Sequence, residues 1–405
     1  MNEAIAIGPA PVGMLAEVPG AGRWLAAAAA EGTIQTVRVS FADRLGQWRG
    51  KRVPVEHFLR REPYAMAFCD GMIVCDVQCD VIEETPFTNY TTGYPDMHVQ
   101  VDAGRVRRVG WHSGEAYVFG SPANVHGEPL AVAPVNVLRQ VVDRAARLGV
   151  SLSGRANLCG AFLDGPDTPT PAGAEAATAL ANELLRGLVA TGLPAGSVAG
   201  LSEPGAFELG LGPAAPMELA ESLVVAKGAA KELARSRGSH AVFMTRRPGA
   251  AQPALLEIEA TVTGARGVDP DRLAAMLRHA RPLLFPSINA IRAEPPKVCT
   301  SSAAHGGHVV SCWASSEADA ATALAVLVAG VGALVESVSS PGAELEPGPA
   351  VNDLAAAARL RESHWLSSWL GSDFIENSIA LLEHEARIFR EAVTDWEIAR
   401  YWSAS

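Results

Sequence analysis

Hydrophobic and polar residues alternate with two different periodicities along this chain, and the change from one to the other falls near Ala133. Residues 36–41 alternate with a period of two, which is typical of a half-buried strand. Residues 135–149 instead carry apolar side chains at helical spacing and end at Gly149, which predicts a helix. We therefore expect an N-terminal arm over residues 1–32, a small β-rich domain over 33–133 and a larger domain over 134–405.

The larger domain should be α+β, because strand-like and helix-like segments alternate up to about residue 335. Strands are predicted over 151–163, 204–211 and 254–262, and a helix over 170–191 with Pro171 in its first turn. The weakly polar run 320–335 is shorter than the roughly 20 apolar residues that cross a membrane, so it predicts a buried helix. Prolines after Ser339 indicate a loop, which is followed by helices near 351–361 and 373–391. We expect a curved antiparallel sheet backed by these helices.

Composition and charge narrow the class of partner. With 48% hydrophobic and 19% charged residues, the 405-residue chain can bury a sizeable core. A net charge of -11 argues against nucleic acid, which is bound through clustered lysine and arginine, and no segment favours a membrane. Six cysteines are too few for a disulfide framework in a chain of this length, so reduced thiols in the cytoplasm are expected. The N-terminus lacks the basic and apolar pattern of a secretory signal.

Motifs in the centre and at the end of the chain resemble those of glutamine synthetases. The ending, residues 393–401 (VTDWEIARY), shares seven identities with the family's V-T-D-W-E-x-x-R-Y terminus. The matching central positions are Gly205, Glu208, Lys227, Lys231, Glu232, Ala234, Phe243 and Met244. The resemblance implies a small N-terminal β-grasp-type domain, a large catalytic-like domain and a ring-shaped, dodecamer-like homo-oligomer.

The chemistry of that family requires groups that this chain has largely lost. Family members phosphorylate a carboxylate with ATP and let an amine displace the phosphate, which takes several carboxylates, a histidine and arginines around two or three divalent ions. Here the family's E-x-E strand aligns with residues 157–159, which read Asn-Leu-Cys, and its H-x-H pair becomes Glu257 and Glu259. No basic residue lies between Lys297 and Arg359. The pattern therefore argues against ATP as a cofactor.

Three residues keep places where the family has catalytic groups. Glu208 stands where the family has a metal-binding carboxylate, and Arg292 stands alone where it has two basic residues. The family's F-D-G aspartate, which lies at the ammonium site of a neighbouring subunit, corresponds with a one-residue shift to Asp70. A plain turn residue is the alternative for Asp70. Arg246 and Arg247 occupy the family's M-x-K-P position, where they would hold an anionic ligand or be solvated surface arginines.

A metal site of another kind is the main chemical hypothesis. His305 and His308 lie three residues apart in a Gly-rich turn, and imidazole is a common ligand for zinc, iron or copper. With Cys159, Glu208 and Glu257 they would form one transition-metal site in place of magnesium, whereas loop histidines with ordinary hydrogen bonds are the alternative. Glu257 and Glu259 lie two apart and share one face of a strand, where each would raise the pKa of the other unless a cation lies between them.

Three functions remain open on these observations. The first is a degenerate glutamine synthetase homologue that binds a divalent metal (Zn, Fe, Cu or Mg) or a small-molecule amine or amino-acid ligand, with altered C–N or N–N chemistry in specialised metabolism. The second is an active ATP-dependent amide or γ-glutamylamide ligase whose missing residues come from shifted loops. The third is a non-catalytic scaffold or regulator.

Overall fold

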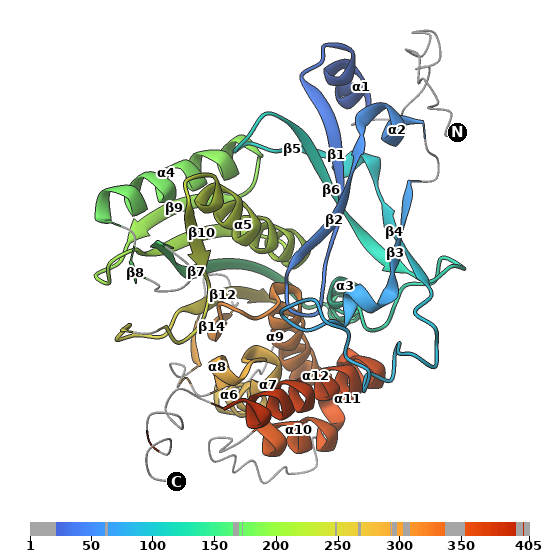
Figure 1. The fold of residues 1–405 in the computed structure, drawn as a ribbon. Coiled ribbons are helices and arrows are strands. Elements are labelled where there is room, and N and C mark those ends of the chain that lie inside the picture. Colours follow the sequence, from blue (N-terminus) through green and yellow to red (C-terminus); the bar gives the residue numbers. More distant parts are fainter. Residues whose placement is uncertain are drawn as a thin grey trace.

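The computed structural model describes residues 22–60, 64–164, 170–171, 173–247, 249–265, 269–291, 293, 298–302, 308–336, 353–393 and 400 (Figure 1). The N-terminal arm up to residue 21, the proline-rich loop after Ser339 and most of the terminal motif 393–401 lie outside these residues. So do Arg292 and His305, and the roles expected for them stay predictions.

The first part of the chain forms a sheet with the strand order β2-β1-β6-β4-β3, and β5 pairs with β6. Within it, β1 and β6 run parallel and the neighbouring strands antiparallel. The apolar positions of the expected strand, including Val37 and Val39, are buried against helices α1 (Gly22–Ala30) and α2 (Val55–Leu59). The strands are β1 (Ile34–Ala42), β2 (Trp48–Pro54), β3 (Ala65–Cys69), β4 (Asp96–Val101), β5 (Arg107–Arg108) and β6 (Gly114–Ala123).

The second part forms a larger sheet with the order β13-β14-β12-β7-β10-β9, and β8 and β11 pair with β7. Every pairing between its described strands is antiparallel, as expected. Pro171 belongs to the short strand β8 and not to a first helical turn, because the helix that follows begins at Ala174. The strands are β7 (Ser151–Asp164), β8 (Thr170–Pro171), β9 (Ala195–Gly200), β10 (Ala206–Ala214), β11 (Ser239–Val242), β12 (Leu255–Thr263), β13 (Cys299–Ser302) and β14 (His308–Ser315).

Helices cover one face of this larger sheet and bury its apolar positions. Alternate residues such as Leu158 on β7 and Ile258 on β12 share one core with helix side chains. The expected buried helix is α9 (Ala320–Val335), which lies at the centre of that core. The other helices are α3 (Pro134–Arg147), α4 (Ala174–Ala190), α5 (Pro216–Ser236), α6 (Pro270–His279), α7 (Arg281–Leu284), α8 (Ile288–Ile291), α10 (Asp353–Glu362), α11 (His364–Leu370) and α12 (Ser372–Glu391).

Helix α5 joins the two sheets, and the lysine and glutamate positions noted in the sequence make the contacts. Arg38 of β1 forms ion pairs with Glu115 of β6 at 2.6 Å and with Glu232 of α5 at 2.8 Å. Lys231 donates to the side chain of Gln47 at 2.9 Å. Removing such charges from water is costly unless they are paired, so this network fixes the first sheet against α5.

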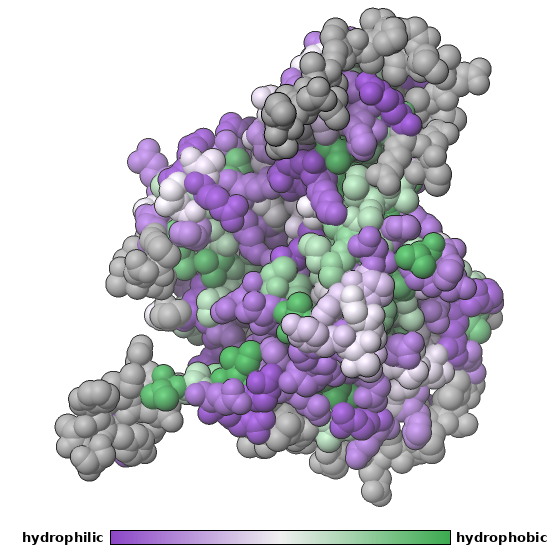
Figure 2. Space-filling view, turned by 45° about the vertical axis from the view of Figure 1, so that its right-hand side comes forward, coloured by the Kyte–Doolittle hydropathy of each residue, from purple (hydrophilic) through white to green (hydrophobic). Residues whose placement is uncertain are grey.

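Figure 2 shows hydrophilic side chains over most of one face, with small hydrophobic patches between them. Among the described helices, none is long and apolar enough to cross a membrane.

Candidate functional site

The face of the larger sheet that the helices leave uncovered carries several of the polar residues singled out in the sequence. Side chains that lie directly opposite each other in an antiparallel pair project to the same face. Glu208 on β10 lies opposite Cys159 on β7, and Asn157 on β7 lies opposite Glu257 on β12. The fold therefore brings Cys159, Glu208 and Glu257 onto one face across three adjacent strands.

Asn157, Cys159, Glu208 and Glu257 form a row across these strands, and both of its carboxylates accept hydrogen bonds from within the row. The side-chain amide of Asn157 donates to Oε2 of Glu257 at 3.0 Å. The thiol of Cys159 lies 3.9 Å from Oε2 of Glu208, and burial, with the charge of Glu208 adding to it, raises the pKa of this thiol to about 11. At neutral pH the thiol of Cys159 is therefore protonated and donates to Glu208.

His308 does not join this row, which corrects the expected grouping of metal ligands. His308 lies at the start of β14, opposite the buried Val262 of β12. Its side chain projects to the same face as those of Val310 and Cys312, which is the face that the helices cover. Glu257 lies opposite Trp313, on the other face. In the part of the chain that the structure describes, no three histidine, cysteine or acidic side chains are placed to hold a metal ion.

Asp70 is buried in the first part of the chain, at the start of the 3-10 turn η1 (Asp70–Ile73). Its carboxylate accepts from the hydroxyl of Thr88 at 2.8 Å, and burial raises its pKa. These contacts are those of a turn residue. Its expected place at the site of a neighbouring subunit stays a prediction.

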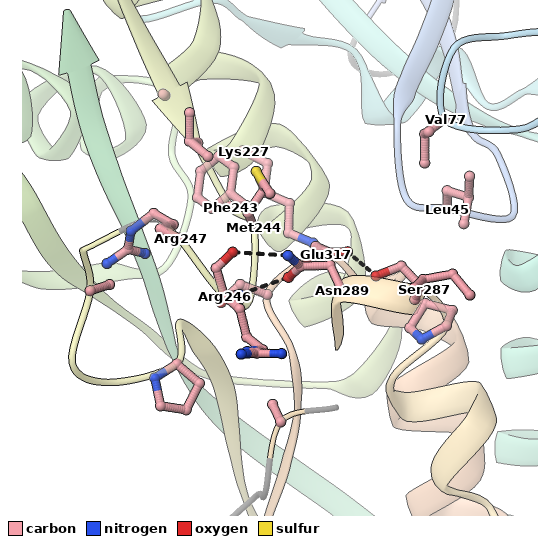
Figure 3. Close-up of a pocket in the computed structure, with 18 of the residues that line it drawn as sticks. Leu45, Val77, Lys227, Phe243, Met244, Arg246, Arg247, Ser287, Asn289 and Glu317 are labelled. Atoms are coloured by element: carbon pink, nitrogen blue, oxygen red, sulfur yellow. Dashed lines mark hydrogen bonds between the residues drawn. The ribbon is translucent and has the colours of Figure 1, made fainter. Parts of the chain in front are cut away.

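A large cavity, which the sequence did not indicate, lies where the two parts of the chain meet. It has a volume of about 1210 Å3 and is bounded by the loop around Leu45, by residues 241–247, 250–253 and 286–289, and by α12. Figure 3 shows Leu45 and Val77 across the cavity from Met244, Arg246 and Asn289. Residues from segments far apart in the sequence line it, so it exists only in the folded chain.

The two adjacent arginines predicted to hold an anion both line this cavity. The backbone of Arg246 exchanges two hydrogen bonds with the side chain of Asn289, of 2.7 and 2.9 Å, which fixes the loop. Its exposed guanidinium has no ion pair within the described residues. Arg247 is buried and pairs with Glu203 at 3.1 Å, while its Nη1 atom finds no hydrogen-bond partner among the described residues.

Acidic side chains line the same cavity. Glu317 is held in place by the backbone N–H of Thr245 at 2.7 Å and by the hydroxyl of Ser287 (Figure 3). Glu385 of α12 is half-buried and has no hydrogen bond or ion pair with any residue that the structure describes. Burial raises its pKa, and the nearby charge of Asp76 adds to this effect. A cationic group beside Glu385 would oppose both contributions and lower this pKa.

A buried lysine completes the lining. The ammonium of Lys227 donates to the backbone oxygen of Ala318 at 2.8 Å, and burial lowers its pKa to about 8. The cavity thus combines cationic groups, acidic groups and the apolar side chains of Phe243, Met244 and Phe389. A mixed lining of this kind can bind a ligand that carries charged and apolar groups.

Comparison with known proteins finds similar sequences among ligases that join glutamate to amines. No protein-family model matches the chain. It is 33% identical over 122 residues to the glutamate–isopropylamine ligase of a Pseudomonas species, covering 29% of this chain and 26% of that protein. It is 25% identical over 244 residues to a gamma-glutamylethanolamide synthetase of Streptomyces coelicolor, covering 55% of this chain and 52% of that protein. The chain thus spans about half the length, or less, of these curated relatives.

Solved structures match over nearly the whole chain. A complex of GmaS with ADP aligns with a TM-score of 0.73 and 18% identity, covering 94% of this chain and 99% of that one. Ligand-free GmaS aligns with a TM-score of 0.74 and 17% identity, covering 93% and 98%. A glutamine synthase homologue gives a TM-score of 0.72 at 17% identity, covering 92% and 98%. These matches confirm the fold that the motifs predicted.

Proposed function

From the premise that this chain has the glutamine synthetase fold and resembles ligases of that family, we propose that it binds a small amino-acid-like zwitterion in the cavity and does not carry out ATP-dependent ligation. One observation carries the proposal. Arg246 and Glu385 line the same cavity with opposite charges, and neither forms an ion pair within the described residues.

A charged ligand that enters the cavity loses water around its own charges, so it binds best where Arg246 and Glu385 replace that water. Removing an ionised group from water costs free energy unless an opposite charge or hydrogen bonds replace the water. The carboxylate of a zwitterion would pair with Arg246, and its ammonium with Glu385. The side chains of Phe243 and Met244 would contact the carbon atoms between them.

The uncovered face of the sheet supports the second half of the proposal. Phosphoryl transfer from ATP needs divalent ions, and magnesium is held by carboxylates. At the positions that resemble the family's E-x-E strand, this chain presents the amide of Asn157 and the protonated thiol of Cys159. Glu208 and Glu257 are then the two carboxylates of that row, and Glu257 already accepts a hydrogen bond from Asn157.

Calorimetry on the whole protein tests the proposal directly. Titration with α-amino acids, monoamines and dicarboxylates, each with and without Mg-ATP, should give binding of a zwitterion that does not depend on ATP. The variants Arg246→Ala and Glu385→Gln should each weaken this binding about tenfold or more, since each loses one charge-assisted contact. Arg278→Ala and Glu175→Gln alter exposed residues elsewhere and should bind like the wild type. Equal affinity in all four variants would refute the cavity as the site.

An active glutamate–amine ligase is the second candidate, because the two curated relatives described above are named for such a reaction. It predicts Mg-dependent ATP binding and release of phosphate when glutamate and a monoamine are present, with loss of activity in Glu208→Gln. That result would replace the proposal. Elemental analysis of the purified protein tests the transition-metal hypothesis, which now depends on His305 outside the described residues. If the protein binds neither a ligand nor a metal and a partner protein co-purifies with it, a scaffold function would be favoured.

A further inference from the structure

Two cysteines, Cys75 and Cys79, lie close together on either side of Val77, which lines the cavity. The Sγ atoms of Cys75 and Cys79 lie 3.7 Å apart. The turn between them is held by Asp76, whose carboxylate accepts from the backbone N–H groups of Gln78 at 2.9 Å and Asp80 at 2.8 Å. Cys79 also donates its backbone N–H to the oxygen of Asp76 at 3.1 Å. This local network, and not a chance contact of mobile side chains, brings the sulfurs together.

The backbone at Cys79 is in the left-handed region, with a φ of 72°. Residues other than glycine adopt this conformation at a cost in free energy, and such positions concentrate at functional sites. Here the conformation closes the turn and directs the Cys79 side chain towards Cys75. The hydrogen bonds of the turn over residues 75–79 come from the carboxylate of Asp76 and from the backbone. The turn could therefore form without cysteine at either end.

The two thiols differ in the way that a reactive and a resolving cysteine differ. Cys79 is exposed, whereas Cys75 is buried. Burial raises the pKa of Cys75 to about 12, with Asp43 adding to the effect. The guanidinium of Arg49 lies 3.6 Å from the sulfur of Cys75, where it would stabilise negative charge as that thiol loses its proton. A solvent-accessible thiol beside a second cysteine is the usual arrangement of a redox-sensitive pair.

We propose that Cys75 and Cys79 form a reversible disulfide when the protein meets a hydroperoxide. The thiolate of Cys79 attacks the terminal peroxide oxygen, which gives a sulfenic acid and releases an alcohol, or water from hydrogen peroxide. The sulfur of Cys75 then displaces the hydroxyl group as water, and the S–S bond forms. In total the two thiols lose two electrons and two protons, and the peroxide takes up these electrons and protons as its O–O bond breaks. A small dithiol reverses the reaction by exchange.

The disulfide would also change the cavity. Val77 lies between the two cysteines in sequence and lines the cavity together with Leu45 (Figure 3). Bonding requires the sulfurs to approach to about 2.05 Å, so the turn that carries Val77 must tighten. Arg49, which contacts Cys75, also pairs with Asp43 at 2.7 Å, and Asp43 holds the backbone of Leu45. This consequence for ligand binding depends on the proposed function, but formation of the bond does not.

The sequence provides a clean assay for the bond. Cleavage before aspartate separates peptide 70–75 from peptide 76–79, so a disulfide alone would hold these two peptides together. After treatment of the full-length protein with hydrogen peroxide and blocking of the remaining thiols, mass spectrometry should find the linked pair. The number of titratable thiols should fall from the six cysteines of the reduced chain to four. Treatment with dithiothreitol should restore all six.

Two variants distinguish the proposal from general oxidation. Cys79→Ser should abolish the linked peptides, while Cys69→Ser, which removes another exposed cysteine of the same region, should retain them. Sulfinic or sulfonic acid at Cys79 without the linked peptides, or linkage of Cys79 to Cys69, would overturn it. If a cavity ligand is found, peroxide should change its affinity at least threefold in the wild type and leave it unchanged in Cys79→Ser. Linked peptides without a change in affinity would support formation of the disulfide and refute its effect on the cavity.

Discussion

Asn157 on β7 donates a hydrogen bond of 3.0 Å to Glu257 on β12, and both side chains project from the face of the sheet that the helices leave uncovered. An amide next to a carboxylate leaves one negative charge at this point. A second carboxylate there would repel the first unless a cation lay between them. The residue at position 157 is therefore one determinant of whether the face can hold a divalent ion.

The variant Asn157→Asp tests this relationship. It replaces a donor by a second negative charge at a half-buried position, so we expect a loss of about 1–3 kcal/mol in the free energy of unfolding. Mg2+ or Zn2+ should restore part of the loss by bridging the two carboxylates. Urea denaturation with and without each ion measures both effects.

Ser153→Asp is the matched control, because it adds the same charge at an exposed position of the same strand and face. It should change the stability by less than about 0.5 kcal/mol. If Asn157→Asp behaves like this control in both conditions, Glu257 and Asn157 are not coupled and the argument about the face fails.

Helix α5 provides a test of how the two parts of the chain are joined. Gly228 faces Trp48 of β2 so closely that a Cβ atom at this position would lie 2.3 Å from a ring carbon of the tryptophan. In an open helix, Gly→Ala would gain about 0.5–1 kcal/mol. Here the clash should prevail, and Gly228→Ala should lose about 1–3 kcal/mol.

A double-mutant cycle separates the two effects of that change. In the background Trp48→Ala, the ring is gone and Gly228→Ala should become stabilising by about 0.5–1 kcal/mol. Thermal or urea denaturation of the four proteins gives the coupling. The same loss in both backgrounds would show that Trp48 does not limit the residue at this position.

The sequence predicted those features that depend on local pattern. The strand over 151–163 and the helices over 320–335 and 373–391 appear as β7, α9 and α12, because uninterrupted periodicity over that length leaves few alternatives. Pro171 was misplaced because a proline at a helix start and one in a short edge strand look alike in sequence.

The site depended on features that no local pattern contains. The residue types alone group His308 with Glu257, whereas the register of β14 against β12 places them on opposite faces. A shift of one residue would reverse that assignment, and no local pattern contains the register. Arg246 and Arg247 were selected from their motif, but the acidic half of the cavity was not, because Glu385 comes from a helix about 140 residues further along the chain.

The buried ammonium of Lys227 makes the stability depend on pH above neutrality. Burial lowers its pKa from 10.5 to about 8 in the folded protein, so between these values the unfolded chain binds more protons than the folded chain. The free energy of unfolding should therefore rise with pH from about 8 to 10.5, by up to about 3 kcal/mol from this group, and stay flat below 8 with respect to it. The variant Lys227→Met should lose that rise, while Lys51→Met, at an exposed lysine, should keep it. Urea denaturation at a series of pH values compares the three proteins, and parallel curves for the wild type and Lys227→Met would show that Lys227 keeps its proton throughout this range.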